Sequence, residues 1–318
     1  MGKKVLVTAT GYSTYCQKAK QLLEGRGVEV IENQLGRPFT QAELLAVVED
    51  IDGVVAGVDT WDEAIFTQAP KLRAIARFGV GVDNIDLASA KEHGVVVSNA
   101  KGINSSPVAE LAVALMLASL RNIPHLNVTT RQGKWERFMG RDLSGLTVGL
   151  LGFGDIAQRV AKKLSGFDVT LVAYDLYPNA EKAATLHTNM IPLEEVLTRS
   201  DIVSMHLPSL PETQGIMNDA RFASMKDGAI FINTARGALV QEEALYRALF
   251  SGKLSAAACD VFEEEPANPS NPLFTLENYI ATPHTAAETF ATYENVGLLT
   301  AQALLDVFDG KEPVNRLN

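Results

Sequence analysis

The stretch "TVGLLGFGDIAQRVAKKLSGFDVTLVAYD", residues 147–175, decides the fold. An apolar run is followed by a glycine-rich turn, an amphipathic helical pattern and a second apolar run. The turn carries small residues in the spacing G-x-G-x-x-G/A, namely Gly152, Gly154 and Ala157. Glycines there let backbone amides approach a pyrophosphate, and a helix N-terminus favours negative charge. The stretch therefore predicts a strand–helix–strand unit that binds a dinucleotide, with the backbone amides of Asp155 and Ile156 facing the phosphates.

Asp175 closes the second apolar run, about 20 residues beyond the glycine turn, where the dinucleotide pattern places an acidic residue. A carboxylate at this point accepts hydrogen bonds from the two hydroxyl groups of a ribose and repels a 2′-phosphate. The neighbouring residues, "DLYPN", contain no arginine that could bind such a phosphate. The sequence therefore predicts NAD rather than NADP as the cofactor.

The same alternation of short β-rich runs and helical stretches extends over the rest of the chain. One series occupies residues 3–99, and a second series follows a long helical stretch at residues 105–120. This alternation is typical of parallel sheets covered on both faces. We therefore expect an α/β protein with two doubly wound parallel-sheet domains and a cleft between them: a Rossmann-type cofactor domain at residues 101–287, and a flavodoxin-like substrate-binding domain formed by residues 1–100 and 288–318.

Composition excludes several other classes of protein. The net charge of the 318 residues is −10, which argues against nucleic acid as a partner. Cys16 and Cys259 are the only cysteines and lie far apart, so we expect a cytoplasmic protein without disulfides or a bound metal. The first residues enter a strand at once, which predicts no signal peptide, and the apolar run at residues 111–120 is too short to span a membrane.

Residues suited to catalysis gather where the second series of strands ends, and ligands bind at that edge of a doubly wound sheet. These residues are Gly152, Asp175, His206, Pro208, Thr234, Ala235, Arg236, Asp260 and His284. Hydride transfer from an alcohol carbon needs a base for the hydroxyl proton and a cation near the forming carbonyl. His284 suits the base, Glu265 in "DVFEEEP" can orient its imidazole and stabilise the charged form, and the guanidinium of Arg236 can grip a carboxylate.

Six segments in order resemble the signature segments of the D-isomer-specific 2-hydroxyacid dehydrogenases, most closely the phosphoglycerate dehydrogenase branch. They are "RFGVGVDNIDL" (77–87), "GLLGFGDIAQRVA" (149–161), "HLPSLPETQGIMN" (206–218), "INTARGALV" (232–240), "DVFEEEP" (260–266) and "TPHTA" (282–286). The resemblance covers nearly the whole chain. It implies an NAD-dependent oxidoreductase that acts on CH–OH groups and forms a homodimer through its cofactor domain.

The resemblance also implies roles for individual residues. Arg236 would anchor the substrate carboxylate, Glu265 would pair with His284, and His284 would donate or accept the proton. The cofactor would contact Gly152, Gly154, Asp155, Ile156, Asp175, His206, Pro208, Thr213, Thr234, Ala235, Asp260 and Ala286, with Asp260 at the nicotinamide carboxamide. The backbone of Val80 and Gly81 would meet the substrate from the other domain. Ala157, Ala286 and Ala287 stand where glycines are more usual in this family.

The substrate is less well defined by the sequence. Arg77, Arg131 and Lys134 resemble, in position, cations that hold a phosphate, which favours 3-phosphoglycerate and 3-phosphohydroxypyruvate. A glyoxylate or hydroxypyruvate reductase would need only Arg236 and the backbone of residues 79–81. The chain ends at Asn318, so we expect a short form that lacks a C-terminal regulatory domain and serine feedback.

Two classes other than a hydroxyacid dehydrogenase also remain open. One is a non-catalytic, NAD-sensing scaffold similar to the corepressors that resemble this family, which would keep the fold and could keep the three catalytic residue types. The other is an amino-acid dehydrogenase, which would call for a catalytic lysine in the cleft. No lysine stands at the strand ends named above.

Overall fold

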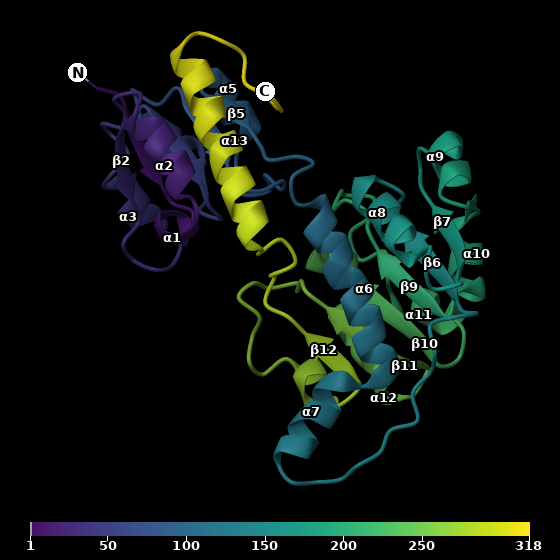
Figure 1. The fold of residues 1–318 in the computed structure, drawn as a ribbon. Coiled ribbons are helices and arrows are strands. Elements are labelled where there is room, and N and C mark those ends of the chain that lie inside the picture. Colours follow the sequence, from purple (N-terminus) through teal and green to yellow (C-terminus); the bar gives the residue numbers. More distant parts are fainter. Residues whose placement is uncertain (1) are drawn as a thin grey trace. The chain divides into compact units, whose positions relative to one another are not determined.

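The structure, a computed structural model, describes residues 2–318 (Figure 1). It divides into two compact units. Unit 1 ends its first segment at Asn104 and resumes at Glu288–Asn318, and unit 2 is Ser105–Ala287. Each unit is built around a sheet of parallel strands. The predicted α/β class with two doubly wound parallel sheets is confirmed.

Unit 1 contains a five-stranded sheet in the order β2-β1-β3-β4-β5. The strands are β1 (Lys4–Val7), β2 (Glu29–Glu32), β3 (Gly53–Ala56), β4 (Ala74–Arg77) and β5 (Val96–Ser98). The helices are α1 (Tyr12–Tyr15), α2 (Gln17–Glu24), α3 (Gln41–Leu45), α4 (Glu63–Gln68), α5 (Leu87–Glu92) and α13 (Phe290–Phe308). Figure 1 shows α13, from the end of the chain, packed beside α2.

Both faces of the unit 1 sheet are buried, because successive side chains of a strand point to opposite faces. Val5 and Val7 of β1 pack with α1, α2 and α13, whereas Leu6 between them packs with α3, α4 and α5. Two separate apolar clusters therefore sandwich the sheet. This is why the two strands β3 and β4 consist almost entirely of apolar residues, whereas β2 at the edge of the sheet keeps two glutamates.

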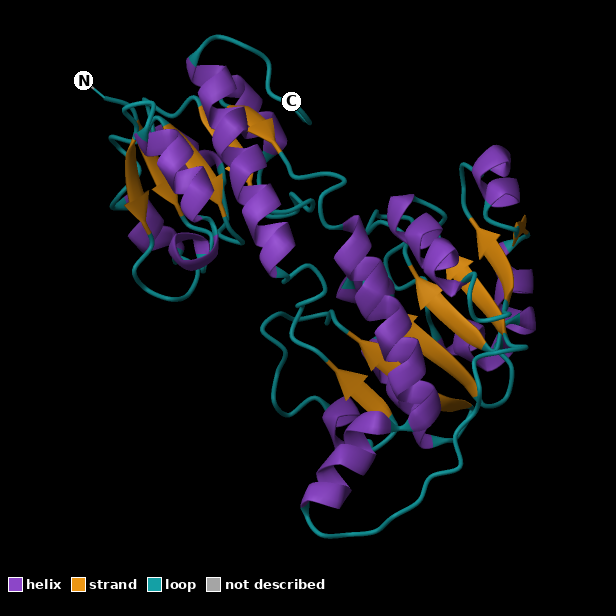
Figure 2. Cartoon of the chain, in the orientation of Figure 1, coloured by secondary structure: helices purple, strands orange, loops and turns teal. Residues whose placement is uncertain are grey.

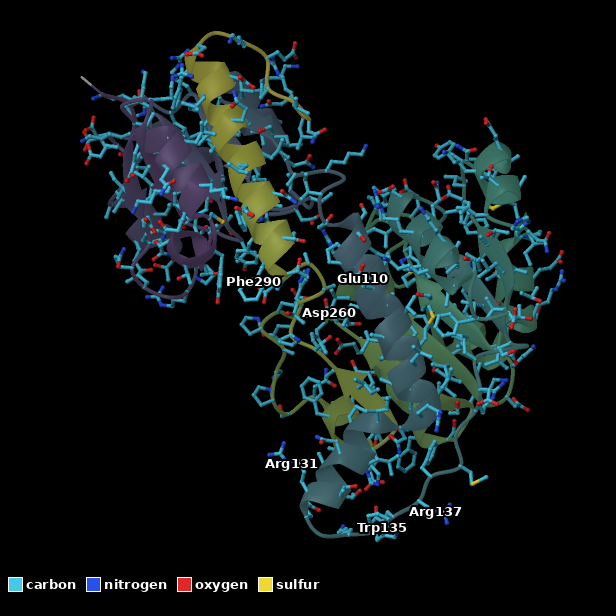
Figure 3. All side chains as sticks on the ribbon, viewed as in Figure 1. Glu110, Arg131, Trp135, Arg137, Asp260 and Phe290 are labelled. Atoms are coloured by element: carbon cyan, nitrogen blue, oxygen red, sulfur yellow. The ribbon has the colours of Figure 1, made fainter. Side chains whose placement is uncertain are left out.

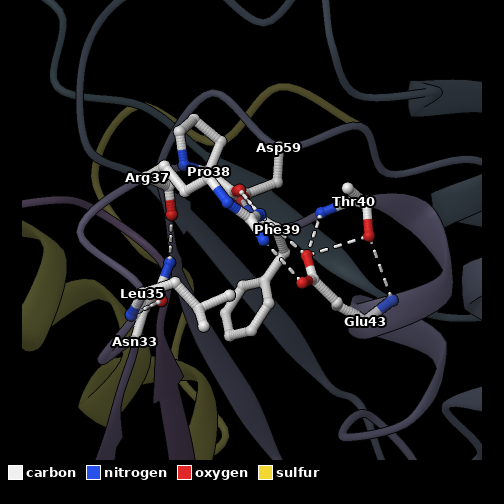
Figure 4. Close-up of polar contacts among 8 residues, drawn as sticks. All are labelled: Asn33, Leu35, Arg37, Pro38, Phe39, Thr40, Glu43 and Asp59. Atoms are coloured by element: carbon white, nitrogen blue, oxygen red, sulfur yellow. Dashed lines mark hydrogen bonds and ion pairs between the residues drawn. The ribbon is translucent and has the colours of Figure 1, made fainter.

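Polar contacts hold the loop between β2 and α3 in place (Figure 4). Arg37 donates two hydrogen bonds to the carboxylate of Glu43, at 2.9 and 2.7 Å, and Glu43 also caps α3 together with Thr40. The Arg37 guanidinium, followed by the hydrogen bonds from Thr40, lowers the pKa of Glu43 to about 2. The N–H of Phe39 donates to Asp59 at 2.6 Å, which ties this loop to the residues after β3.

Unit 2 contains a seven-stranded sheet in the order β12-β11-β10-β9-β6-β7-β8. The strands are β6 (Thr147–Leu151), β7 (Thr170–Tyr174), β8 (Thr188–Met190), β9 (Ile202–Met205), β10 (Ala229–Asn233), β11 (Leu254–Cys259) and β12 (Tyr279–Ala281). The helices are α6 (Ser105–Arg121), α7 (Ile123–Arg131), α8 (Asp155–Leu164), α9 (Ala180–Thr185), α10 (Leu193–Arg199), α11 (Asp219–Ser224) and α12 (Glu242–Phe250), with short 3₁₀ turns η1 (Gly237–Leu239) and η2 (Pro272–Thr275).

Helices cover both faces of the unit 2 sheet (Figure 2). α6 and α8 bury one face, and α10, α11 and α12 bury the other. The chain runs from β6 outward to β7 and β8, then returns to the opposite side of β6 with β9. The strand order therefore reverses between β6 and β9, and ligands of doubly wound sheets bind at the carboxyl ends beside such a reversal.

No single helix within residues 2–318 combines the length and apolarity needed to cross a membrane. α6 and α7 reach that length only as a pair bent by 61°. Most of the apolar surface of α6 is buried in the core of unit 2.

Candidate active site

The glycine turn after β6 brings backbone into close contact with the neighbouring strand. Gly152 has φ +94°, and a Cβ there would lie 2.7 Å from the carbonyl carbon and oxygen of His206. Gly154 caps α8, and a Cβ added to it would meet nothing within 4 Å. The first turn of α8 therefore opens onto free space, where its N–H groups can bind an anion.

Asp155 lies in that first turn, and its side chain is hydrogen-bonded elsewhere. Its carboxylate lies 3.1 Å from Nε of Arg159, one helical turn further along α8. Burial acts to raise the pKa of Asp155, but hydrogen bonds from Ser105 and Arg159 hold it below its ordinary value. The carboxylate is thus ionised and directed toward these two partners, while the backbone of residue 155 remains at the start of the helix.

Asp175 connects the glycine turn to the chain that follows β7. One carboxylate oxygen accepts the N–H of Phe153 at 2.7 Å, and the other accepts the N–H of Tyr177 at 2.8 Å. These bonds fix the carboxylate beside the turn. Each oxygen keeps a lone pair that can accept a further hydrogen bond from a hydroxyl group.

His206 follows β9 and faces into the sheet edge. Its Nε2 lies 2.9 Å from the hydroxyl of Ser204, which is fully buried. Burial lowers the pKa of His206 to about 4. The chain then turns tightly, because the hydroxyl of Thr213 donates to the carbonyl of Pro208 at 2.7 Å.

The low pKa of His206 makes stability depend on pH. The folded protein keeps this imidazole neutral down to about pH 4, whereas the unfolded chain takes up the proton near the ordinary value of 6.5. Stability that is present above pH 6.5 is therefore lost as the pH falls toward 4, by on the order of 3 kcal/mol. We expect His206→Gln to flatten this part of a denaturation profile measured across that range. If the free energy of unfolding fell equally steeply with pH in His206→Gln and in the parent, the low pKa of His206 would be contradicted.

His284 and Glu265 form a direct pair. His284 Nδ1 lies 2.7 Å from one Glu265 oxygen, and the other oxygen accepts the N–H of Phe262 at 3.0 Å. Burial acts to raise the pKa of Glu265, but hydrogen bonds from His284 and Phe262 and the charge of Arg236 together lower it. The carboxylate is therefore ionised and orients the imidazole, which leaves Nε2 as the ring nitrogen that can exchange a proton. The side chain of His284 is 49% exposed.

Gly237 joins the segment that carries Arg236 to the segment that carries Glu265. A Cβ at Gly237 would overlap the backbone carbonyl of Phe262. Backbone cannot shift away cheaply, so we expect Gly237→Ala to lower the free energy of unfolding by about 3 kcal/mol or more and to impair any activity of the site. Chemical denaturation measures the first effect. Gly166→Ala is the matched control, since a Cβ there meets nothing within 4 Å; similar losses in both variants would contradict the close fit.

Unit 1 carries the other residues expected at the substrate. Arg77 Nε donates to the carbonyl of Gly81 at 2.9 Å, and its Nη1 donates to that of Phe78 at 2.6 Å. The carbonyl of Val80 accepts the side-chain amide of Asn99 at 2.7 Å. Among the hydrogen bonds of residues 2–318, none uses the N–H of Val80 or Gly81. These two N–H groups are thus open to a ligand.

The structure does not gather the three cations expected around a phosphate into one unit. Arg77 lies in unit 1, whereas Arg131 ends α7 and Lys134 follows it in unit 2. The ammonium of Lys134 lies 3.7 Å from Glu136.

Comparison with known proteins identifies the family. The model of the "D-isomer specific 2-hydroxyacid dehydrogenase, NAD binding domain" matches residues 113–286. The chain belongs to this family. The resemblance stated from the sequence is therefore confirmed, as is the expectation of a Rossmann-type domain with NAD as its cofactor.

Relatives within this 2-hydroxyacid dehydrogenase family carry several names. D-3-phosphoglycerate dehydrogenase of Archaeoglobus fulgidus is 39% identical over 95% of this chain and 57% of its own length. Hydroxypyruvate reductase of Thermotoga maritima is 40% identical over 89% of this chain and 92% of its own length. The TT0316 protein from Thermus thermophilus has a solved structure with a TM-score of 0.91 and 38% identity, covering 99% of this chain and 100% of that one. The chain spans little more than half the length of the phosphoglycerate dehydrogenases it matches.

The residues of unit 2 fit the NAD that this family binds. The open first turn of α8 suits the pyrophosphate, and Asp175 suits a ribose diol. The hydroxyl of Thr234 is buried and has no hydrogen-bond partner among residues 2–318. A bound cofactor could supply the missing partner at this edge of the sheet. Among the same residues, no group of three or more His, Cys, Asp or Glu side chains is arranged to hold a metal ion.

Proposed function

We propose that the protein is an NAD-dependent D-2-hydroxyacid dehydrogenase, which interconverts a 2-hydroxy acid and the corresponding 2-keto acid. The observation that carries the proposal is the pair formed by His284 and the ionised Glu265 within the field of Arg236. These are the acid–base group, its orienting carboxylate and the carboxylate anchor that the reaction needs. They stand in the domain that binds NAD in this family.

The three side chains divide the reaction between them. In oxidation His284 Nε2 removes the hydroxyl proton, and in reduction it returns a proton to the carbonyl oxygen. Glu265 fixes the ring through Nδ1 and stabilises the imidazolium when it forms. Arg236 binds the substrate carboxylate through its planar fork. NAD, when bound, accepts the hydride from the alcohol carbon, and NADH supplies it in reduction.

Backbone N–H groups complete the proposed substrate contacts. The N–H groups of Val80 and Gly81 make no hydrogen bond among residues 2–318. They would donate to the substrate carboxylate in addition to Arg236. Gly79 has φ +152°, and a Cβ there would lie 2.9 Å from Nη1 of Arg77, so Arg77 and Gly79 fit one another and shape this loop. Arg77 would therefore reach the substrate chiefly through the backbone it holds.

For the substrate we propose 3-phosphohydroxypyruvate, with 3-phosphoglycerate in the opposite direction. Two relatives that are 39% and 40% identical to this chain are named D-3-phosphoglycerate dehydrogenase, which supports this choice. Hydroxypyruvate or glyoxylate is the second candidate. It is favoured by the engagement of the Arg77 guanidinium with backbone carbonyls, and by a relative of similar length that is named hydroxypyruvate reductase.

NADH oxidation with a panel of 2-keto acids, with and without a phosphate, tests both the proposed reaction and the proposed substrate. Higher kcat/KM for 3-phosphohydroxypyruvate supports the first substrate, and equal or better values for hydroxypyruvate or glyoxylate support the second. NADH binding without turnover on any acid would contradict the dehydrogenase and favour an NAD-sensing scaffold. Turnover that requires ammonia would instead indicate an amino-acid dehydrogenase.

We also propose a homodimer formed through unit 2. The segment after α7, residues 132–140, exposes Trp135, Phe138 and Met139 to 88%, 48% and 94%. Figure 3 labels Trp135 on this segment. A hollow of about 300 Å³ near the end of α6 is lined by four apolar residues, Leu117, Leu120, Leu143 and Phe167, and by four polar ones, Arg121, Arg141, Asp142 and Ser144. Large aromatic and thioether groups exposed on one segment suit contact with a second copy of the chain. Sedimentation equilibrium tests this: a dimer that Trp135→Ala weakens supports it, and a monomeric parent excludes it.

A further inference from the structure

We propose that Asn233 and Asp260 are positioning residues: their buried side chains hold the two backbone segments that present Arg236 and His284. Neither residue needs to touch the substrate in this role. The inference rests on the proposed function, because it assigns a purpose to side chains that support the proposed acid–base set. Asn233 ends β10, and Asp260 follows the adjacent strand β11.

Asn233 uses both ends of its side-chain amide on the segment that leads to the guanidinium. Its Oδ1 accepts the N–H of Ala235 at 3.0 Å, and its Nδ2 donates to the carbonyl of Arg236 at 2.9 Å. The side chain is buried. Because the two bonds bracket the peptide unit between Ala235 and Arg236, they fix the direction in which the Arg236 side chain leaves the backbone.

Asp260 plays the corresponding part for the segment after β12. Its carboxylate accepts the hydroxyl of Thr282 and the N–H groups of Thr285 and Ala286, the last two at 2.9 Å each. Its own carbonyl accepts the N–H of His284 at 2.7 Å. The four bonds enclose His284 on both sides, and Asp260 is 0% exposed.

The backbone of His284 needs such support. Its φ is +51°, in the left-handed region that residues other than glycine rarely adopt. A residue keeps this conformation only where its surroundings impose it. The bonds from the segment at residues 282–286 to Asp260 impose it here. They thereby set the direction of the imidazole that meets Glu265 at 2.7 Å.

This role differs from the nicotinamide contact that the family resemblance implies for Asp260. A carboxylate offers about four acceptor positions, and three hydrogen bonds from Thr282, Thr285 and Ala286 already use most of them. The N–H of Asp260 also donates to the carbonyl of Asn233 at 2.9 Å. The two positioning residues are thus linked to one another, and one continuous set of buried and partly buried hydrogen bonds holds the backbone segments that carry the guanidinium and the imidazole.

Kinetics of Asn233→Ala, Asn233→Asp and Asp260→Asn test the inference, with Asn218→Ala as the matched control. Asn218 also accepts a backbone N–H with its side chain, at 3.1 Å, but it does so at the start of α11. We expect Asn233→Ala to raise KM for the keto acid about tenfold. Asn233→Asp keeps the acceptor for the N–H of Ala235 but places an oxygen against the carbonyl of Arg236, so it should raise KM at least as much. Asp260→Asn should lower kcat about tenfold or more and shift the pH profile, while the Kd of NADH changes by less than about twofold. Asn218→Ala should move none of these values.

Two results would overturn the inference while leaving the proposed function intact. One is an unchanged KM, kcat and pH profile in the folded variants of an active parent. The other is a large loss of NADH affinity in Asp260→Asn with kcat preserved at saturation, which would make Asp260 a cofactor contact only.

If the parent turns over no keto acid, the proposed function fails. The positioning role of Asp260 can then still be tested by NMR. The pH titration of the His284 ring signals, assigned with His284→Gln, should change in Asp260→Asn and stay the same in Asn218→Ala. Identical titrations in the parent and Asp260→Asn would overturn the positioning role.

Discussion

Replacing His284 with alanine should lower kcat for keto-acid reduction by about 10²–10⁴-fold, the range by which general acid–base catalysis accelerates such steps. The variant lacks the imidazole that lies 2.7 Å from Glu265. No side chain would then donate a proton to the carbonyl oxygen of the substrate. The KM of the keto acid should change little, because Arg236 is retained as the carboxylate anchor. Steady-state NADH oxidation at saturating substrate measures the effect.

His125→Ala is the control for this variant, since His125 lies in α7 and contacts Glu136 at 3.2 Å. It should keep the activity of the parent. Glu265→Gln should give an intermediate loss and narrow the pH range of activity, because the ionised carboxylate no longer stabilises the imidazolium. A His284→Ala variant within a few-fold of the parent would exclude His284 as the acid–base group.

Replacing Arg236 with lysine should raise KM for the keto acid by about 10–10³-fold. An ammonium group keeps the charge but loses the planar fork that binds both oxygens of a carboxylate. The Kd of NADH, measured by fluorescence titration, should stay near that of the parent. The segment that carries Arg236 is anchored by Asn233, so the backbone should remain in place in the variant.

Arg247→Lys is the matched control for charge and size. Arg247 also makes a bidentate pair, with Asp219 at 2.9 and 2.8 Å, but on the surface of α12. This variant should leave KM unchanged. An unaltered KM in Arg236→Lys would remove Arg236 from the role of carboxylate anchor and leave the substrate without its principal cation in unit 2.

Local signals were sufficient to predict the fold. The glycine turn at Gly152 and the acidic residue at Asp175 depend on spacing within a single strand–helix–strand unit, and this spacing can be read from the sequence. The buried strands were equally clear, because both faces of a doubly wound sheet are covered and the strands are continuous apolar runs. His284, Glu265 and Arg236 were recognisable because their residue types are uncommon at the ends of apolar strands.

The supporting residues could not be predicted in the same way. Gly237 has no positive φ that would distinguish it from an ordinary turn glycine, and its requirement comes from Phe262, which is far from it in the sequence. Asn233 reads as the last residue of a strand, and its function depends on which backbone atoms lie within reach. Arg77 donates to nearby carbonyls, and no sequence pattern reveals these contacts. Its role at a phosphate stays a prediction.

The configuration of the product tests the central proposal most directly. The protein is incubated with NADH and the best keto acid of the panel, and the hydroxy acid is analysed by chiral chromatography alongside NADH consumption. We expect one D-hydroxy acid formed for each NADH oxidised, and formation of the same product about 10²–10⁴-fold more slowly with His284→Ala. An L-hydroxy acid, a racemic product, or NADH loss that does not depend on the keto acid would contradict a D-2-hydroxyacid dehydrogenase.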